Sequence, residues 1–259
     1  MRNFRHLIVF GIAFGITCYF FTSIGFTAPP PASTFRSEQK KAPKVKEAYN
    51  LKWEYLKTKL VADGMDTTSF KIFIRGFKQE RKLELWVKSP KTEWKLFDTY
   101  DMCYISGDLG PKRCQGDGQV PEGFYHVSVF NPYSNYLISL GVSYPNASDN
   151  IFGCKGDKGG AIMIHGNCVS IGCIPITDDK IREVYVMAVE ARTDGQLNIP
   201  IHIFPTRMTI DNISSLTVQD AYSSFKDFWT NLKDGYDYFE TNHEVPDVSV
   251  DAKGKYIFK

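Results

Sequence analysis

The sequence predicts an α+β fold, mostly β with helices, in which most strands come early and most helices come late. About seven short segments have the apolar character or the alternation of β-strands. Two amphipathic helical patterns follow in the second half of the chain, and one shorter pattern precedes the strands. This order is typical of a β-sandwich or of mixed sheets carrying a few helices.

The strand pattern begins with residues 70–74 (FKIFI) and 83–87 (LELWV), which alternate apolar and polar side chains. Polar residues 78–81 lie between them, so the sequence predicts a β-hairpin. Further strands are expected over residues 94–100, 124–130, 137–142, 161–164 and 201–204.

Three segments have helical spacing. Residues 45–60 place Ala48, Leu51, Tyr55 and Leu56 along one side of a short helix. Thr177 is expected to cap a second helix whose first turn holds two aspartates. Residues 216–232 form a third helix with an apolar stripe, and we expect that stripe to pack on the rest of the domain.

Composition narrows the function classes. Of 259 residues, 43% are hydrophobic and 23% are charged, as in ordinary globular proteins and unlike disordered chains. The net charge of +2 argues against binding nucleic acid through a broad basic face. Six cysteines are too few for a disulfide scaffold of this length.

The first residues resemble an export signal. Arg2 and Arg5 precede a nearly unbroken apolar run over residues 7–26, which is about the length of a membrane span. Residues 1–28 are therefore expected to be a signal peptide or an N-terminal membrane anchor, with the rest of the chain outside the cytoplasm. Residues 29–46, rich in Pro, Lys and Ser, are expected to form a solvated linker.

Candidate chemistry concentrates in residues 165–173 (HGNCVSIGC). One interpretation is nucleophilic catalysis, in which a histidine activates a cysteine thiol. Another is a zinc site built from His165, Cys168 and Cys173, although no fourth ligand lies at a typical spacing. The third is a structural loop with buried or oxidised cysteines. Spacing alone leaves the three open.

HGNCVSIGCI resembles the active-site motif of the L,D-transpeptidase catalytic domain (YkuD-type) family, in its short-loop murein L,D-transpeptidase-like subgroup. Segments 107–125 and 130–146 resemble the family's upstream blocks, in the same order. The resemblance covers about residues 70–205. It implies a catalytic domain over residues 47–206, followed by a helical C-terminal extension over residues 207–259 that packs on it.

Matched to the family motif, Cys173 is the expected nucleophile and His165 the expected general base. Ser170 matches the residue that supports the histidine, Gly172 the glycine of the oxyanion hole, and Gly166 the glycine after the base.

Substrate contacts are expected from Gly166 and, by family position, from Lys112, Tyr144 and Asn146; His202 is expected near the site. Pro175 stands where many members have an arginine, and the spacing from His165 to Cys173 is shorter than in most members.

The implied activity is peptidoglycan L,D-transpeptidation: a stem peptide forms a thioester on Cys173 and is transferred to an amine. A peptidoglycan amidase or peptidase of the same fold, which hydrolyses the thioester, is the first alternative, and a non-catalytic wall-binding module is the second. No metal or cofactor is implied. The expected partners are stem peptides and, through the N-terminal segment, the cell membrane, and no binding of nucleic acid is expected. The protein is expected to be a monomer located in the cell envelope.

The remaining cysteines have separate expectations. Cys103 and Cys114 are candidates for a disulfide that closes a small loop. Cys168 is expected to be a packed loop cysteine rather than a redox partner of Cys173. Cys154 has no evident partner.

Overall fold

The computed structural model describes residues 32–259. The expected signal peptide or anchor therefore lies outside the described residues. Among residues 32–259, no helix is both long enough and apolar enough to cross a membrane.

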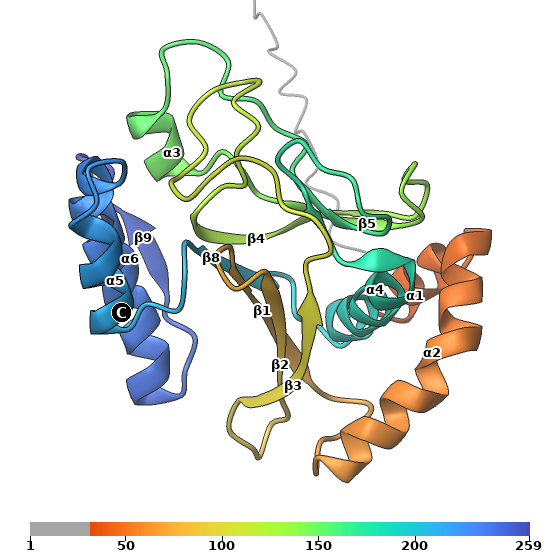
Figure 1. The fold of residues 1–259 in the computed structure, drawn as a ribbon. Coiled ribbons are helices and arrows are strands. Elements are labelled where there is room, and N and C mark those ends of the chain that lie inside the picture. The colour runs from red at the N-terminus through yellow and green to blue at the C-terminus, as the bar shows by residue number, and fades with distance from the viewer. Residues whose placement is uncertain (1–31) are drawn as a thin grey trace, which may run out of the picture. The chain divides into compact units, whose positions relative to one another are not determined.

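An eight-stranded mixed sheet forms the centre of the fold (Figure 1). This arrangement of one large sheet with helices around it confirms the predicted α+β class. In spatial order its strands are β3 (Lys95–Asp101), β2 (Lys82–Lys88), β1 (Lys71–Phe77), β8 (Pro200–Phe204), β4 (Gly123–Asn131), β5 (Ser139–Val142), β6 (Met163–His165) and β7 (Ile174–Pro175).

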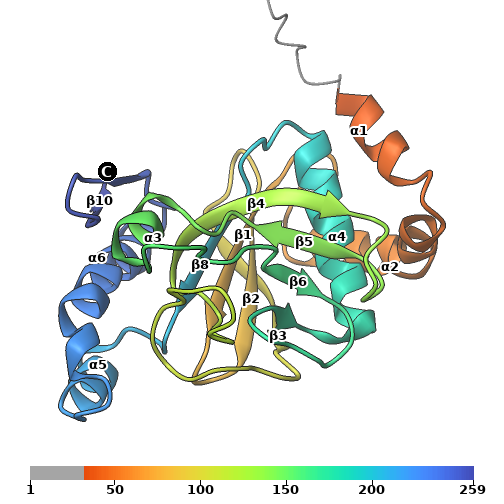
Figure 2. The same cartoon turned by 90° about the horizontal axis from the view of Figure 1, so that it is seen from above.

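Strand β4 joins the two halves of the sheet and curves as it does so (Figure 2). Its first residues pair with β8 and its last residues pair with β5. A register shift between Val127 and Val129 marks a bulge in this strand. Because a bulge increases local twist and bend, it lets the sheet curl and brings β6 and β7 above the rest of the fold.

The predicted hairpin is confirmed: β1 and β2 pair antiparallel from Lys71 opposite Lys88 to Phe77 opposite Lys82. Alternation along β1 then decides what each face meets. Ile72 and Ile74 point into the main core, whereas Phe73 and Phe77 point to the other face.

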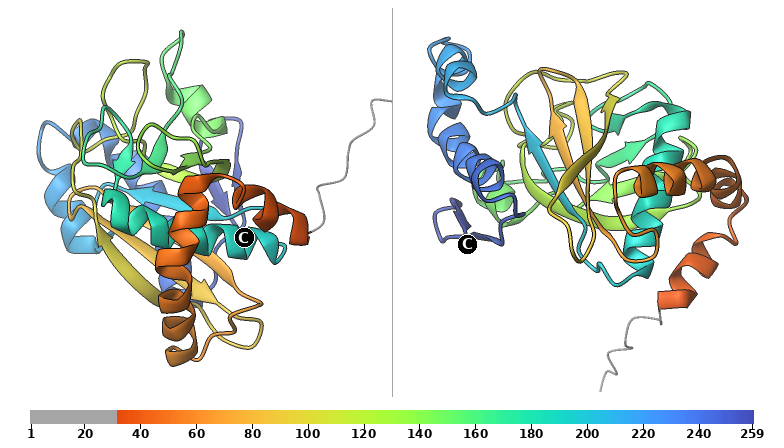
Figure 3. Two further views of the ribbon diagram at one scale, coloured as in Figure 1. Left: turned by 90° about the vertical axis from the view of Figure 1, so that its right-hand side faces the viewer. Right: turned by 90° about the horizontal axis from the view of Figure 1, so that it is seen from below.

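Three helices cover the face of the sheet to which Ile72 and Ile74 point: α1 (Ala32–Gln39), α2 (Pro43–Ala62) and α4 (Thr177–Thr193) (Figure 3). The predicted helix over 45–60 is confirmed, but its expected apolar side is only half right, because Ala48 and Leu56 are buried whereas Leu51 and Tyr55 face solvent. Leu51 and Tyr55 are 57% and 51% exposed. The buried side is instead formed by Val45, Ala48, Tyr49, Leu56 and Leu60.

The expectation of a solvated linker over residues 29–46 is wrong for the described residues from 32 on, because helix α1 begins at Ala32 and helix α2 begins at Pro43. Pro43 lies at the first turn of α2, where a missing N–H leaves no helical hydrogen bond unmade. Arg36, expected to be solvated, forms an ion pair with buried Glu190 at 2.5 Å. The charged residues of this segment therefore dock it onto α4 instead of keeping it in solvent.

The C-terminal elements cover the other face. They are α5 (Ile210–Thr217), a 3-10 turn η1 (Ser223–Phe225), α6 (Lys226–Asn242), β9 (Val248–Val250) and β10 (Tyr256–Phe258), with β9 and β10 paired as a hairpin. The predicted single helix over 216–232 is wrong, because the chain leaves the helix after Thr217. β-Branched Thr217 and Val218 lie at this break, and such residues favour helix less. Val218, expected in the apolar stripe, is 80% exposed.

Side chains of α6 pack on the aromatic residues of the sheet. Trp229, Leu232 and Tyr236 join a cluster with Phe77 and Phe204. A buried arginine of β1, Arg75, donates a 2.7 Å hydrogen bond to Glu240 on the same helix. The C-terminal segment is therefore continuous with the packing of the sheet.

A buried ion pair fastens α6 to the loop before β4. The Lys78 ammonium lies 3.0 Å from the Glu122 carboxylate and donates to the carbonyl oxygens of Gly110 and Val120 at 2.7 and 3.0 Å. Glu122 also accepts from the Gly110 N–H at 2.8 Å and from the Trp229 indole N–H at 2.7 Å. Every one of these contacts is shielded from water, since Lys78 and Glu122 are 2% and 0% exposed.

We predict that Trp229→Phe lowers the free energy of unfolding by about 2–3 kcal/mol, because a buried carboxylate loses a charged hydrogen bond. Trp53→Phe is the matched control, since Trp53 is half-buried and its indole N–H has no hydrogen-bond partner within residues 32–259. That control should lose less than about 1 kcal/mol in urea denaturation. Equal losses would show that the indole–carboxylate bond does not fasten α6.

Candidate active site

His165 ends strand β6 and is 1% exposed. Its Nδ1 contacts the carbonyl oxygen of Gly166, and its ring stacks on Tyr136 with the centroids 4.6 Å apart. A carbonyl can only accept, so Nδ1 carries the proton. Nε2 is buried and has no hydrogen-bond partner within residues 32–259, which leaves its lone pair free to accept a proton. Burial lowers the pKa of His165, so the imidazole is neutral at pH 7.

Cys173 directly precedes β7, which pairs parallel with β6. In that register Ile164 lies opposite Ile174, and both are buried. Successive side chains of a strand point to opposite faces, so Cys173 and His165 share the face opposite the two isoleucines. The pairing of β6 with β7 therefore places the two predicted catalytic side chains on the same face of the sheet.

Among the described residues, Cys173 is the one cysteine outside a disulfide. Burial raises the pKa of its thiol, while the Met163 backbone and the positive charge of Lys112 act in the opposite direction. The thiol lies 3.6 Å from the carbonyl oxygen of Ala161. Burial therefore favours the neutral thiol of Cys173, as it favours the neutral imidazole of His165.

Ser170 braces the turn before the cysteine. Its hydroxyl donates to the Cys173 carbonyl oxygen at 2.8 Å and accepts from the Gly172 N–H at 3.0 Å. It also lies 3.3 Å from the hydroxyl of Ser106. Gly172 has φ of 131°, and a Cβ there would lie 3.0 Å from the Gln119 carbonyl oxygen, so this turn requires glycine. In this geometry Ser170 orients the cysteine's backbone, whereas the Gly166 carbonyl orients the histidine.

Gly166 allows a close approach of α4 to the site loop. A Cβ at Gly166 would clash with the Asp178 carboxylate, which accepts a 2.8 Å hydrogen bond from the Asn167 N–H. The expected Thr177 cap is wrong: Thr177 is the first helical residue, and Ile176 at the cap position makes no side-chain bond. Asp178 turns toward the loop instead. Asp178 and Tyr136 are the site neighbours that sequence reasoning missed, since neither lies in the motif.

Two disulfides flank the site, and both correct the sequence-based expectation. Cys103 pairs with Cys168, and Cys114 pairs with Cys154, with Cα–Cα distances of 5.4 and 5.6 Å. Cys103 and Cys114 were candidates for a disulfide with each other, and the observed pairings exclude that bond. The sheet instead carries Cys103 to the site loop, where its N–H donates to the Pro175 carbonyl oxygen.

The disulfide at Cys168 also contradicts the zinc interpretation, because its sulfur is not available as a thiolate ligand. Within residues 32–259, no group of three or more histidine, cysteine or acidic side chains is arranged to hold a metal ion.

Of the expected substrate residues, Lys112 lies close enough to Cys173 to influence its thiol pKa. It is 4% exposed and is held by the Cys114 carbonyl at 2.8 Å and the Asp117 carboxylate at 2.6 Å. Its ammonium lies 5.8 Å from the ring centre of Tyr144, whose hydroxyl donates to the Lys158 carbonyl. Lys112 and Tyr144 therefore belong to one wall near the thiol.

Asn146 and His202 have structural positions. Asn146 caps the short helix α3 (Ala147–Phe152), and its amide donates to the Phe124 carbonyl at 3.1 Å. His202, 3% exposed in β8, packs edge-on against the rings of Phe73 and Phe124. Burial lowers the pKa of His202 well below its ordinary value. His202 and Asn146 line a cavity to which neither His165 nor Cys173 contributes, so the structure does not bring them to the thiol.

A histidine at the end of β6 and a cysteine directly before β7 thus lie on one face of the sheet. The family model of the YkuD L,D-transpeptidase catalytic domain matches residues 78–203. The chain is 43% identical over 188 residues to "Putative L,D-transpeptidase YafK" of Escherichia coli K12, covering 72% of this chain and 73% of that protein. The chain therefore belongs to the L,D-transpeptidase catalytic-domain family, as its motifs predicted.

Two solved structures are also similar. The helical cell shape determining protein Pgp2 from Campylobacter jejuni is 16% identical with a TM-score of 0.41, covering 71% of this chain and 73% of that one. Bd1075 from Bdellovibrio bacteriovorus is 18% identical with a TM-score of 0.38, covering 70% and 77% of the two chains.

We predict that the Cys103–Cys168 disulfide orders the site loop. Replacing both cysteines by serine should raise amide hydrogen exchange across residues 166–172, because the loop loses its covalent tie. The matched control is Cys114→Ser with Cys154→Ser, which removes the other disulfide and should leave exchange in this loop unchanged. If both double variants behave alike in this segment, the disulfide does not order it.

We also predict that Cys173 is not a thiolate at rest. Thiolate is the species that reacts with iodoacetamide, and burial raises the pKa of this thiol. Alkylation should therefore increase steadily with pH and show no plateau between about pH 6 and pH 8. Lys112→Met should shift this profile to still higher pH. A plateau in the acid range would instead reveal a thiolate–imidazolium pair.

Proposed function

We propose that the chain is an extracytoplasmic peptidoglycan L,D-transpeptidase in which Cys173 is the nucleophile and His165 is the general base. The observation that carries this proposal is the unpartnered Nε2 of His165 on the face shared with the free thiol of Cys173. Membership of the family supports the reaction class. We further propose that residues 1–28 direct the domain to the cell envelope as a signal peptide or anchor.

In the first step, His165 Nε2 takes the thiol proton as Cys173 Sγ attacks the carbonyl carbon of a stem peptide next to its diamino acid. The tetrahedral intermediate then collapses: the carbon–nitrogen bond breaks, and the imidazolium returns the proton to the departing amine. Burial helps this return, because it disfavours the charged imidazole. The carbonyl of Gly166 holds Nδ1–H throughout and fixes the ring orientation.

In the second step, an amine of another stem peptide attacks the thioester carbonyl carbon while His165 accepts its proton; the carbon–sulfur bond then breaks, a new peptide bond forms, and the imidazolium returns the proton to the departing Cys173 Sγ. Lys112 supports both steps, because its positive charge favours the developing anion near Cys173. The Gly172 N–H is committed to Ser170, so an oxyanion role for this N–H requires Ser170 to shift its hydroxyl. Ser170 is therefore proposed to position the nucleophile's turn.

Hydrolysis is the second candidate, as in an amidase or peptidase of the same fold. Cys173 is only half-buried, so water can reach a thioester formed on it. The site loop ends in strongly exposed Ile171, which is 89% exposed and does not cover the nucleophile. The same Cys–His pair performs either reaction, and acceptor binding decides the outcome.

The test is incubation of the full chain with purified sacculi, followed by mass spectrometry of the muropeptides. Cys173→Ala should reduce turnover by about 10³-fold or more and His165→Gln by about 10²–10⁴-fold, because each removes a group that moves the proton or the acyl chain. Cys114→Ser with Cys154→Ser is the control for cysteine loss and should retain turnover.

New cross-links identify transpeptidation, and released or shortened stems without cross-links identify hydrolysis. If the wild type and Cys173→Ala produce the same muropeptides, the catalytic proposal fails and the non-catalytic wall-binding alternative takes its place.

A further inference from the structure

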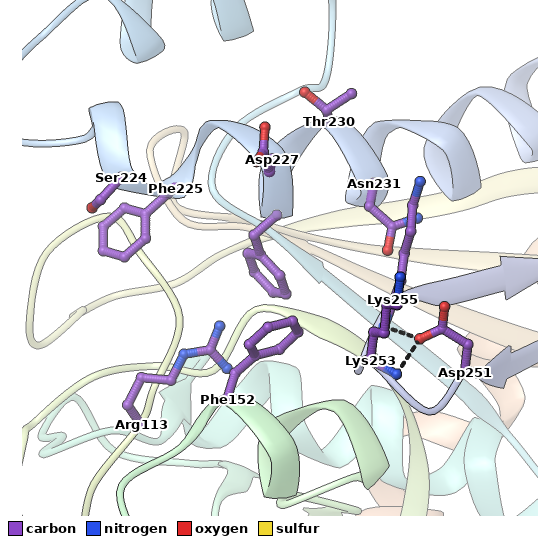
Figure 4. A pocket seen from close by; sticks show the side chains of 11 residues that line it. Arg113, Phe152, Ser224, Phe225, Asp227, Thr230, Asn231, Asp251, Lys253 and Lys255 are labelled. Carbon is purple, nitrogen blue, oxygen red and sulfur yellow. Dashed lines mark hydrogen bonds between the residues drawn. The ribbon is translucent and has the colours of Figure 1, made fainter.

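A cavity lies on the C-terminal side of the molecule (Figure 4). Its volume is about 650 Å³, within the range of small-ligand pockets, and neither His165 nor Cys173 lines it. The walls come from the end of α3, the segment around Arg113, the start of α6, and the turn between β9 and β10. Four segments that are distant in sequence thus meet around one amphipathic hollow.

Arg113 is held rigidly at this cavity. Its N–H donates to the Asp117 carboxylate at 2.8 Å, and its carbonyl oxygen accepts from the Cys154 N–H at 3.1 Å. The disulfide of its neighbour Cys114 with Cys154 adds a covalent tie. The guanidinium lies over two phenylalanine rings, 5.3 Å from the centre of Phe152 and 4.9 Å from that of Phe228. A cation fixed this way needs no reordering when an anion binds.

The positive charges at the cavity are incompletely paired. Arg113 forms an ion pair with Asp149 at 3.7 Å through its Nη1, which is buried and has no hydrogen-bond partner within residues 32–259. Lys253 and Lys255 are exposed at the opposite rim, and neither forms an ion pair with another described residue. Two carboxylates, those of Asp227 and Asp251, line the cavity. The Asp251 carboxylate accepts hydrogen bonds from the backbone N–H groups of both lysines at 2.8 and 2.9 Å.

Arg113 also links this cavity to the site. Its neighbour in sequence, Lys112, influences the Cys173 thiol, whereas Arg113 lines the cavity. Consecutive Cα atoms are about 3.8 Å apart, so the backbone positions of these two residues are separated by a single peptide bond. A polymer held at one surface lies within reach of the other.

We propose that this cavity is a second, non-catalytic binding site for a peptidoglycan stem peptide, whose carboxylate faces Arg113 and the two lysines while its aliphatic part covers Phe225 and Phe228. Charge complementarity supports this occupant, because stem peptides carry free carboxylates and the cavity places Arg113 and two lysines without ion pairs beside apolar rings. The peptide's identity rests on the proposed function. Attachment at two points raises the effective concentration of neighbouring stems at Cys173.

The test uses the full chain carrying Cys173→Ala, so that nothing is turned over during binding. Lys253→Glu with Lys255→Glu reverses the rim charge, and both positions are exposed, so folding should be unaffected. Lys46→Glu with Lys91→Glu makes the same charge change at exposed lysines that do not line the cavity. The probes are purified sacculi and a soluble stem tetrapeptide, in its acid form and with its carboxylates converted to methylamides.

We expect the rim variant to bind sacculi and the acid tetrapeptide about tenfold or more weakly than the control variant, and the methylamide to bind both variants equally weakly. Equal binding of the acid tetrapeptide to both variants overturns the proposal. A rim effect confined to phosphatidylglycerol vesicles also overturns it, because the cavity would then face a membrane. Binding requires no turnover, so the two proposals can fail separately. If the wild type and Cys173→Ala produce the same muropeptides while the rim variant still binds more weakly than the control variant, the catalytic proposal fails and the binding site stands.

Discussion

The buried ion pair between Lys78 and Glu122 is the constraint on which the rest of the fold depends. Two charges removed from water are costly unless every hydrogen-bonding position is filled. Here the partners come from the end of β1, from the loop before β4 and from Trp229 of α6. These three parts must therefore arrive together, because losing one partner leaves a buried charge uncompensated. The pair makes the C-terminal helices part of the same packing as the catalytic sheet.

From this pair the constraint passes to the site. The loop that Lys78 holds includes the Gln119 carbonyl, against which Gly172 packs so closely that no side chain fits. On the other side, the Cys103–Cys168 disulfide ties the site loop to the end of β3. Ser170 closes the remaining gap by bonding the backbone on both sides of the nucleophile's peptide. The backbone around the thiol and the imidazole is consequently held in place, with both side chains on one face of the sheet.

Parts of the fold with strictly local causes were predictable. The hairpin of β1 and β2 follows from alternation and a polar turn, and the motif HGNCVSIGC predicts the family and, through it, His165 and Cys173 as the candidate catalytic residues. Predictions failed where an element distant in sequence determines which side chains are buried or paired. Leu51 and Tyr55 fit a helical stripe but face solvent, because the position of α4 selects another side of α2. Residues around Arg36 looked like a linker, since Glu190, which binds Arg36, is 154 positions away.

The sequence by itself determined the family and the α+β class, and it predicted Cys173 and His165 as nucleophile and base, because these depend on short motifs and on the period of apolar residues. Only the tertiary structure decided the pairing of Cys103 with Cys168, the role of Ser170 as a brace, and the directions in which burial shifts the pKa values of the thiol and the imidazole. Disulfide pairing, hydrogen-bond partners and pKa values depend on burial and on through-space neighbours, and these exist only once the chain has folded.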